Sequence, residues 1–169
     1  EQNYTAALDL AKQAMRKSPN VPALMIALAR LWETTKNFPL ALELYKRAHE
    51  DIQKQGKSSD FKVLVGMANC LYRTNQYAKA TDLYEQIYKQ IPNHPDVLTG
   101  LASCRRYKKQ LEEAEKFALE ARKLDKEHKP AKHELAEILI AEKKTDEAIE
   151  LLEENISRKD LYGDSIDLW

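Results

Sequence analysis

Alanine recurs along this chain at a nearly constant interval. It stands at positions 7, 41, 80, 114 and 148, which are 34, 39, 34 and 34 residues apart. A leucine or phenylalanine follows each of these alanines by three residues, and a second alanine precedes four of them by twelve residues, at positions 29, 68, 102 and 136. Apolar residues at three- and four-residue spacing form one stripe on an amphipathic helix. The pattern therefore predicts helices, with alanine where two helix axes come close.

Short polar segments divide each period into two halves. They include residues 35–37, 74–76 and 143–144. Breaks of this length join antiparallel neighbouring helices. Prolines fall between successive periods, at positions 19, 92 and 130, where proline can end one helix or open the next. The sequence thus predicts a series of helical hairpins.

The hairpin pattern resembles the tetratricopeptide repeat (TPR), a helix–turn–helix unit of about 34 residues. The resemblance rests on large, leucine-like and small residues in the first helix, and on aromatic and alanine positions in the second. The first-helix residues are Met25, Leu28 and Ala29, then Leu64, Met67 and Ala68, then Leu98, Leu101 and Ala102; the second-helix residues are Phe38, Ala41, Tyr45 and Ala48, then Tyr77, Ala80, Tyr84 and Ile87, with Pro92 as the closing proline. The resemblance implies an all-α fold, a TPR α-solenoid of antiparallel helix hairpins that forms a right-handed superhelix, with first helices along its inner face.

We expect a single TPR array over residues 1–169. Its parts are a lone second helix of a truncated repeat at 3–18, full repeats at 22–56, 60–92, 95–126 and 129–159, and the start of a further helix at 163–169. Both ends stop inside the repeat pattern, so we expect the sequence to be a piece of a longer chain. Lys132 and Asn155 depart from the apolar and alanine positions of the fourth full repeat. The interval of 39 adds five residues within 49–60, which lengthen either a helix or a loop.

Composition and charge narrow the class of partner. The chain has 27 Lys and Arg residues and 27 Asp and Glu residues, so its net charge is zero. Bulk attraction to nucleic acid or to an anionic membrane is therefore not expected. No apolar run approaches the roughly 20 residues that span a bilayer, so we expect no membrane insertion. These properties favour another protein as the partner.

The residues that commonly carry chemistry do not form a recognisable site. His133 and Glu134 begin like a zinc-protease motif, but Glu137 stands where the second histidine is required. Cys70 and Cys104 lie one repeat apart, at a position where a small buried side chain is expected. With four glycines in total, a loop that cradles phosphate is not expected either. We therefore expect no enzyme activity, no cofactor and no metal.

The TPR resemblance implies that residues of the first helices line a partner-binding groove. The ten residues expected there combine cations, aromatic rings and polar groups; they are Arg30, Lys62, Asn69, Tyr72, Arg73, Ser103, Arg106, Tyr107, His133 and Glu137. Cations that bind carboxylates, beside rigid aromatic rings, suit an extended and acidic peptide. A carboxylate clamp of the cochaperone type is not expected, since Ile26, Val65 and Thr99 occupy positions where a lysine would be needed.

These features favour a non-catalytic protein–protein interaction scaffold, which docks a peptide or a partner subunit within a multiprotein complex. One alternative is the regulatory or targeting TPR region of an enzyme whose catalytic domain lies outside this sequence, so that other regions of its own full-length chain are partners. A second alternative is an RNA-binding helical repeat, supported only by the basic run at residues 105–109. We expect a cytoplasmic location and leave a nuclear or ciliary one open.

Overall fold

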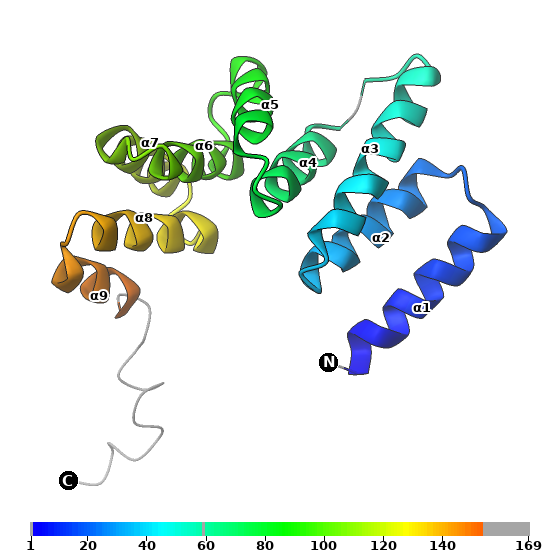
Figure 1. The fold of residues 1–169 in the computed structure, drawn as a ribbon, viewed down its shortest axis with the longest axis horizontal. Coiled ribbons are helices and arrows are strands. Elements are labelled where there is room, and N and C mark those ends of the chain that lie inside the picture. Colours follow the sequence, from blue (N-terminus) through cyan, green and yellow to red (C-terminus); the bar gives the residue numbers. More distant parts are fainter. Residues whose placement is uncertain (1, 59, 154–169) are drawn as a thin grey trace, which may run out of the picture. The chain divides into compact units, whose positions relative to one another are not determined.

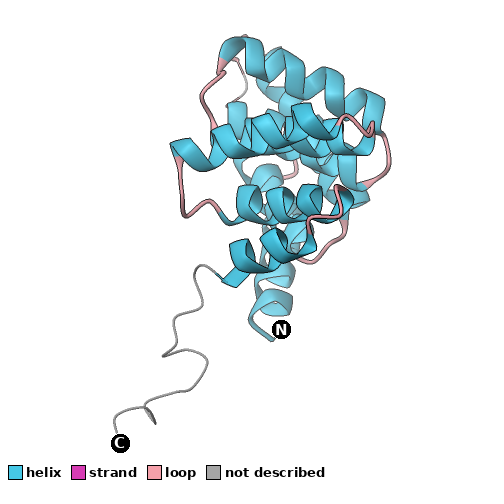
Figure 2. Cartoon of the chain, turned by 90° about the vertical axis from the view of Figure 1, so that its left-hand side faces the viewer, coloured by secondary structure: helices cyan, strands magenta, loops and turns pink. Residues whose placement is uncertain are grey.

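The computed structural model describes residues 2–58 and 60–153, and within these ranges the chain forms nine helices and no strand (Figures 1 and 2). The helices are α1 (Gln2–Lys17), α2 (Pro22–Thr34), α3 (Phe38–Lys54), α4 (Phe61–Arg73), α5 (Tyr77–Gln90), α6 (Pro95–Tyr107), α7 (Leu111–Leu124), α8 (Lys129–Ala141) and α9 (Thr145–Glu153). They fall into two compact units. The amino-terminal unit, residues 1–92, contains α1 to α5, and the carboxy-terminal unit, residues 93–169, contains α6 to α9.

Each unit is built from helical hairpins (Figure 1). In the amino-terminal unit, α2 packs on α3 and α4 packs on α5, while α3 contacts α4 and α1 packs on α2. In the carboxy-terminal unit, α6 packs on α7 and α8 packs on α9, and α8 also contacts α6 and α7. The all-α hairpin fold predicted from the short polar breaks is confirmed. The arrangement of all the hairpins as one continuous array stays a prediction.

The same turn closes all four hairpins. Each turn contains one residue in the left-handed region, at Lys36, Asn75, Lys109 or Lys143, with φ between 60° and 66°. The amide of that residue donates to the carbonyl three residues earlier, and the next amide donates to the carbonyl five residues before it. This pair of bonds is a Schellman motif, which satisfies the last carbonyls of the first helix and reverses the chain.

The alanines that define the repeat are buried between the helices. Ala41, Ala80, Ala114 and Ala148 are all buried, as are the first-helix alanines twelve residues before them. A methyl side chain lets two helix axes approach where a longer side chain would hold them apart. The side chain of Ala7, the position of Asn155 and the helix expected from residue 163 lie outside the described part of the chain.

The long interval between the second and third alanines lengthens both a helix and a loop. Helix α3 has 17 residues, whereas α5 and α7 have 14 each. Six residues separate α3 from α4, whereas four precede α6 and four precede α8. Three of the five additional residues therefore extend the helix and two extend the link. Gly56, with φ of 70°, takes the left-handed conformation just beyond the end of α3.

Lys132 keeps the register of the fourth full repeat although it is charged. It stands at the position that Met25 and Leu98 occupy in other repeats, and it is only 9% exposed. A lysine can bury its four-carbon stem among apolar side chains while its ammonium group reaches toward water. Lys132 can therefore pack in α8 as apolar residues do at the equivalent position of other repeats, although it is charged.

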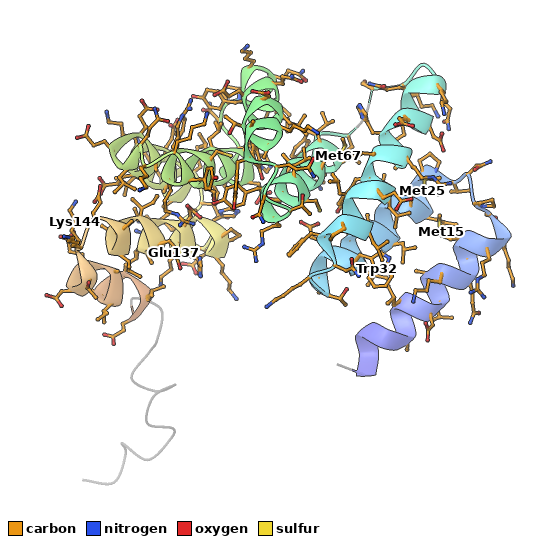
Figure 3. The ribbon with its side chains drawn as sticks, viewed as in Figure 1. Met15, Met25, Trp32, Met67, Glu137 and Lys144 are labelled. Atoms are coloured by element: carbon orange, nitrogen blue, oxygen red, sulfur yellow. The ribbon has the colours of Figure 1, made fainter. Side chains whose placement is uncertain are left out.

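Two aromatic side chains contact neighbouring helices in the amino-terminal unit. Trp32 lies on the side of α2 that faces α1, where Nζ of Lys12 is 5.0 Å from the centroid of the indole ring (Figure 3). Between α3 and α4, the ring of Tyr45 lies directly over the backbone of Gly66. A Cβ atom at residue 66 would be 2.6 Å from Cζ of Tyr45, so only glycine fits beneath the ring in this position.

Candidate functional site

All ten residues predicted to line the groove lie in or at the end of first helices, and they form two sets. The amino-terminal unit contributes Arg30 from α2, with Lys62, Asn69, Tyr72 and Arg73 from α4. The carboxy-terminal unit contributes Ser103, Arg106 and Tyr107 from α6, with His133 and Glu137 from α8. We call the first set the amino-terminal first-helix face and the second set the carboxy-terminal first-helix face.

The amino-terminal first-helix face presents three exposed cations. Arg30, Lys62 and Arg73 are all exposed, and none of them forms an ion pair within the described ranges. The guanidinium of Arg73 lies 5.1 Å from the centroid of the Phe38 ring, a distance at which the ring attracts the cation and holds it in place. Because α2 and α4 contact each other, the three positive charges belong to neighbouring helices. They are therefore available to a negatively charged partner.

Asn69 is oriented by a hydrogen bond from inside the unit. The hydroxyl of Tyr84, which is buried on α5, donates to Oδ1 of Asn69 at 2.5 Å. With this oxygen engaged, the amide nitrogen of Asn69 remains as a donor of hydrogen bonds. Asn69 itself is exposed. It can therefore offer N–H groups to the carbonyls of an extended peptide.

Tyr72 is held by a second aromatic ring. Its ring centroid lies 5.2 Å from that of Tyr77, with an edge-to-face angle of 76°. The hydroxyl of Tyr77 donates to Oδ1 of Asn75 at 2.6 Å, so Tyr77 is also fixed. A half-buried tyrosine held in this way presents apolar area at a low entropic cost on binding.

Beneath this face, Glu33 interacts with two buried groups that sequence analysis did not connect to it. The hydroxyl of Tyr45 donates to Oε2 of Glu33 at 3.0 Å. Burial, and then the negative charge of Glu33, raise the pKa of Tyr45 above its ordinary value. The same two causes raise the pKa of the Cys70 thiol to about 12. Cys70 is therefore protonated at neutral pH, and a protonated thiol is not a nucleophile.

On the carboxy-terminal first-helix face, Arg106 is engaged by glutamates of α8. Its Nε donates to Oε1 of Glu134 at 2.6 Å and its Nη2 to Oε2 of the same residue at 3.3 Å. Nη1 lies 3.8 Å from Oε2 of Glu137. Glu134 is only 7% exposed, and removing one partner of such a pair leaves a buried charge without compensation. The geometry gives Arg106 a structural role between α6 and α8, and sequence analysis missed Glu134.

Ser103, Tyr107 and His133 complete the carboxy-terminal first-helix face. The hydroxyl of Ser103 donates to the carbonyl of Thr99 at 3.1 Å. Tyr107 is 52% exposed. His133 is exposed, and its Nε2 lies 4.0 Å from Oε1 of Glu137 on the next turn of α8. Only Tyr107 therefore offers a large apolar surface to a partner.

The basic run at residues 105–109 is partly neutralised by neighbouring carboxylates. Nε of Arg105 lies 3.1 Å from Oε2 of Glu113, and Arg106 is paired with Glu134. Nucleic-acid affinity depends on cations that can replace the counterions of phosphates. Two of the four cations in this run are already paired within the protein, which weakens the one feature that supported RNA binding.

The part of the chain that the structure describes contains no group of three His, Cys, Asp or Glu side chains placed to hold a metal ion. Within the same ranges, no helix is both long enough and apolar enough to cross a membrane.

Comparison with known proteins agrees with the repeat. Residues 1–132 match the sequence model of a family described as Psidin, N-terminal TPR repeats region. A search of curated protein sequences found no match. The family match covers four of the five helices with a repeat alanine that were identified from spacing.

Solved structures of low sequence identity share the fold. MamA from Desulfovibrio magneticus RS-1 is 16% identical with a TM-score of 0.66, over 89% of this chain and 82% of that one. YrrB, described as a TPR protein with an unusual peptide-binding site, is 13% identical with a TM-score of 0.59, over 97% of this chain and 80% of that one. A chain of the APC/C hetero-tetramer Cut9–Hcn1 is 14% identical with a TM-score of 0.74, over 92% of this chain and 30% of that one. These similarities establish the TPR fold.

Proposed function

Because the chain belongs to the family of Psidin N-terminal TPR repeat regions, we propose that it is a non-catalytic scaffold whose amino-terminal first-helix face docks an extended, acidic segment of a partner protein. The observation that carries this proposal is the set of three exposed cations, Arg30, Lys62 and Arg73, beside Asn69 and Tyr72. TPR proteins generally mediate protein–protein interaction, so the proposal assigns to this chain a role of the kind its fold serves elsewhere.

The chemistry of the face matches an acidic peptide in three respects. Arg30 and Arg73 can each bind a carboxylate through two parallel N–H groups. Asn69 can donate to a backbone carbonyl of the peptide, since its own oxygen is engaged by Tyr84. Tyr72 supplies a rigid ring for an apolar side chain of the same segment. Together these groups suit an extended chain that carries both acidic and apolar residues.

The two first-helix faces contribute differently to this proposal. Arg106 is paired with Glu134 and Glu137, so its charge is largely satisfied within the carboxy-terminal unit. A partner that displaced it would leave the buried carboxylate of Glu134 without its cation. The carboxy-terminal face is therefore better suited to contacts through Tyr107 than to recognition of acidic groups.

Charge reversal of the amino-terminal face tests the proposal. The variant replaces all three cations, as Arg30→Glu, Lys62→Glu and Arg73→Glu. The matched control replaces three exposed cations of the second helices in the same unit, as Lys46→Glu, Arg47→Glu and Lys89→Glu. Both variants change the net charge by the same amount, so a difference between them reports on the position of the charges.

Partners are recovered by affinity capture of the chain and quantified by mass spectrometry, and the far-ultraviolet circular dichroism of both variants is compared with that of the wild type. We expect the face variant to lose the partners that the control variant retains, with both variants folded. Recovery of the same partners in the same amounts by both variants would show that this face is not the docking surface.

A further inference from the structure

A groove with an apolar floor lies on the second-helix side of the carboxy-terminal unit. Helix α8 lies between α7 and α9, which do not contact each other in the described part of the unit (Figure 1). The groove that remains between α7 and α9 has a volume of about 470 Å³. Its apolar lining consists of Leu119 from α7, Leu135 and Leu139 from α8, and Leu151 from α9. A pocket of this size accommodates a few large side chains of a ligand.

The packing of the repeat does not explain why residue 119 is a leucine. It is 47% exposed, and the equivalent positions of the other hairpins carry Lys46, Glu85 and Glu153, all of which are charged. The packing of a hairpin therefore does not require an apolar residue at this position. In contrast, Leu135 and Leu139 are buried and belong to the core. Leu119 alone extends this apolar lining from the core up the wall of the groove on α7.

The rim of the groove is acidic. Glu115, Glu147 and Glu150 line it together with Arg122. Lys144, just before α9, lies near Glu115 and Glu147, and its pKa is raised by its hydrogen bond to Glu142 and further by the charges of these two glutamates. Helix α9 carries only acidic charges, at positions 146, 147, 150 and 153. The groove thus combines an apolar floor and wall with a negative rim, and carboxylates on the rim select a partner of positive charge.

We propose that this groove docks a basic amphipathic helix of a partner protein. The apolar residues of that helix contact Leu119 and the leucines of the floor, and its Lys or Arg residues pair with Glu115, Glu147 and Glu150. A helix fits because its side chains at i, i+4 and i+7 form a narrow apolar stripe that can lie along the groove between α7 and α9. The walls of the site are the second helices α7 and α9, and its floor residues on α8, Leu135 and Leu139, are not among the residues of the first-helix faces, so the site is independent of the function proposed for those faces.

Binding of a designed peptide tests the proposal. The probe is a fluorescent peptide of about 15 residues with leucines at i, i+4 and i+7 and lysines on the remaining faces, and its acidic twin has glutamate in place of every lysine. We expect the whole chain to raise the anisotropy of the basic probe saturably and to leave that of the acidic twin unchanged. A helix-breaking proline in the middle of the basic probe should abolish the binding.

Variants on the same helix locate the site. Leu119→Lys should weaken binding of the basic probe by about tenfold or more, because it removes one buried leucine contact and adds a like charge. Leu124→Lys is the matched control, since Leu124 is 46% exposed on α7 but does not line the groove. It should leave the affinity unchanged. The double variant Glu147→Lys, Glu150→Lys should weaken binding of the basic probe and permit binding of the acidic twin.

Three results would each overturn the proposal. The first is equal affinity for the basic probe and its acidic twin. The second is equal weakening by Leu119→Lys and Leu124→Lys in chains whose circular dichroism is that of the wild type. The third is a wild-type chain that sediments as a dimer and becomes monomeric with Leu119→Lys, because the occupant of the groove would then be a second copy of this chain.

Discussion

Substitution of Gly66 by alanine tests how α3 and α4 are joined. The added Cβ would lie 2.6 Å from Cζ of Tyr45, 2.8 Å from Cε2 and 3.0 Å from the hydroxyl oxygen. Carbon atoms in ordinary contact are about 3.5–4.0 Å apart, so the ring must retreat by about 1 Å. Tyr45 is only 3% exposed, and little open space remains around its ring. A retreat also lengthens the 3.0 Å hydrogen bond from its hydroxyl to Glu33.

The magnitude follows from three effects of known size. Overpacking of a well-packed site costs about 2 kcal/mol, and weakening the hydrogen bond to Glu33 costs about 1 kcal/mol. Replacing glycine by alanine inside a helix returns about 1 kcal/mol through helix propensity. We therefore expect Gly66→Ala to lower the free energy of unfolding by about 2 kcal/mol, although the same substitution stabilises an exposed helix.

The assay must report on the amino-terminal unit, because an array of repeats does not always unfold in one step. Tryptophan occurs at positions 32 and 169 only. In a Trp169→Phe background, the fluorescence of Trp32 on α2 reports on this unit alone. Urea unfolding followed by this signal gives the free energy of unfolding of each variant.

A double-mutant cycle with Tyr45→Leu separates the contact from other effects. Leucine lacks the outer ring atoms that approach Gly66, so alanine at position 66 should then be neutral or stabilising, with a coupling energy of about 2–3 kcal/mol. An equal effect of Gly66→Ala in the presence and absence of the tyrosine ring would refute the reasoning. So would a stabilising effect of Gly66→Ala in the wild-type background.

Two further predictions concern the turns and the buried thiol. Lys109→Gly should stabilise the carboxy-terminal unit by about 0.5–1 kcal/mol, because the left-handed conformation at φ of 60° strains a lysine; Asn75→Gly, at the equivalent turn, should gain less, and thermal or urea unfolding compares them. Cys70→Ala should reduce the loss of stability at alkaline pH. The thiol ionises near pH 9 in the unfolded chain but has a pKa of about 12 in the fold, so the wild type loses about 1 kcal/mol between pH 9 and pH 10 that the variant retains. Urea midpoints at pH 9 and pH 10 measure this difference, and parallel pH profiles for the two chains would contradict the prediction.

The buried positions were predictable because each repeat imposes the same geometric demand. Ala41, Ala80 and Ala114 stand where two helix axes cross, and a crossing of this kind requires a small side chain wherever it recurs. The same type of residue therefore recurs at a fixed interval along the chain, and the interval alone predicts which positions are buried. No helix crossing constrains the five additional residues near Gly56. Only the structure therefore shows that some of them extend α3 and the others extend the loop after it.

The candidate site was less predictable, because the position of a residue within the repeat does not specify which other side chain it contacts. Arg30, Arg73 and Arg106 all lie in first helices. Of these three, only Arg106 forms an ion pair within the described part of the chain, with a glutamate 28 residues away. That separation matches neither the three- nor the four-residue spacing of one helix. It arises only when α8 packs against α6 and brings Glu134 beneath the guanidinium. Helix periodicity contains no signal of this contact.

A comparison of equivalent positions in different repeats does contain a signal of the contact between Arg106 and Glu134. Glu134 stands in its repeat where Gly66 stands in an earlier one, and the second-helix position that holds Tyr45 beside Gly66 holds Ala118 in the hairpin before Glu134. The large and the small residue have thus exchanged places between the two junctions, which keeps their summed volume similar, as close packing requires. The exchange introduces a carboxylate into a buried position, and a buried carboxylate needs a cation. Arg106 supplies it from the preceding first helix, so the buried carboxylate of Glu134 accounts for a cation at this position.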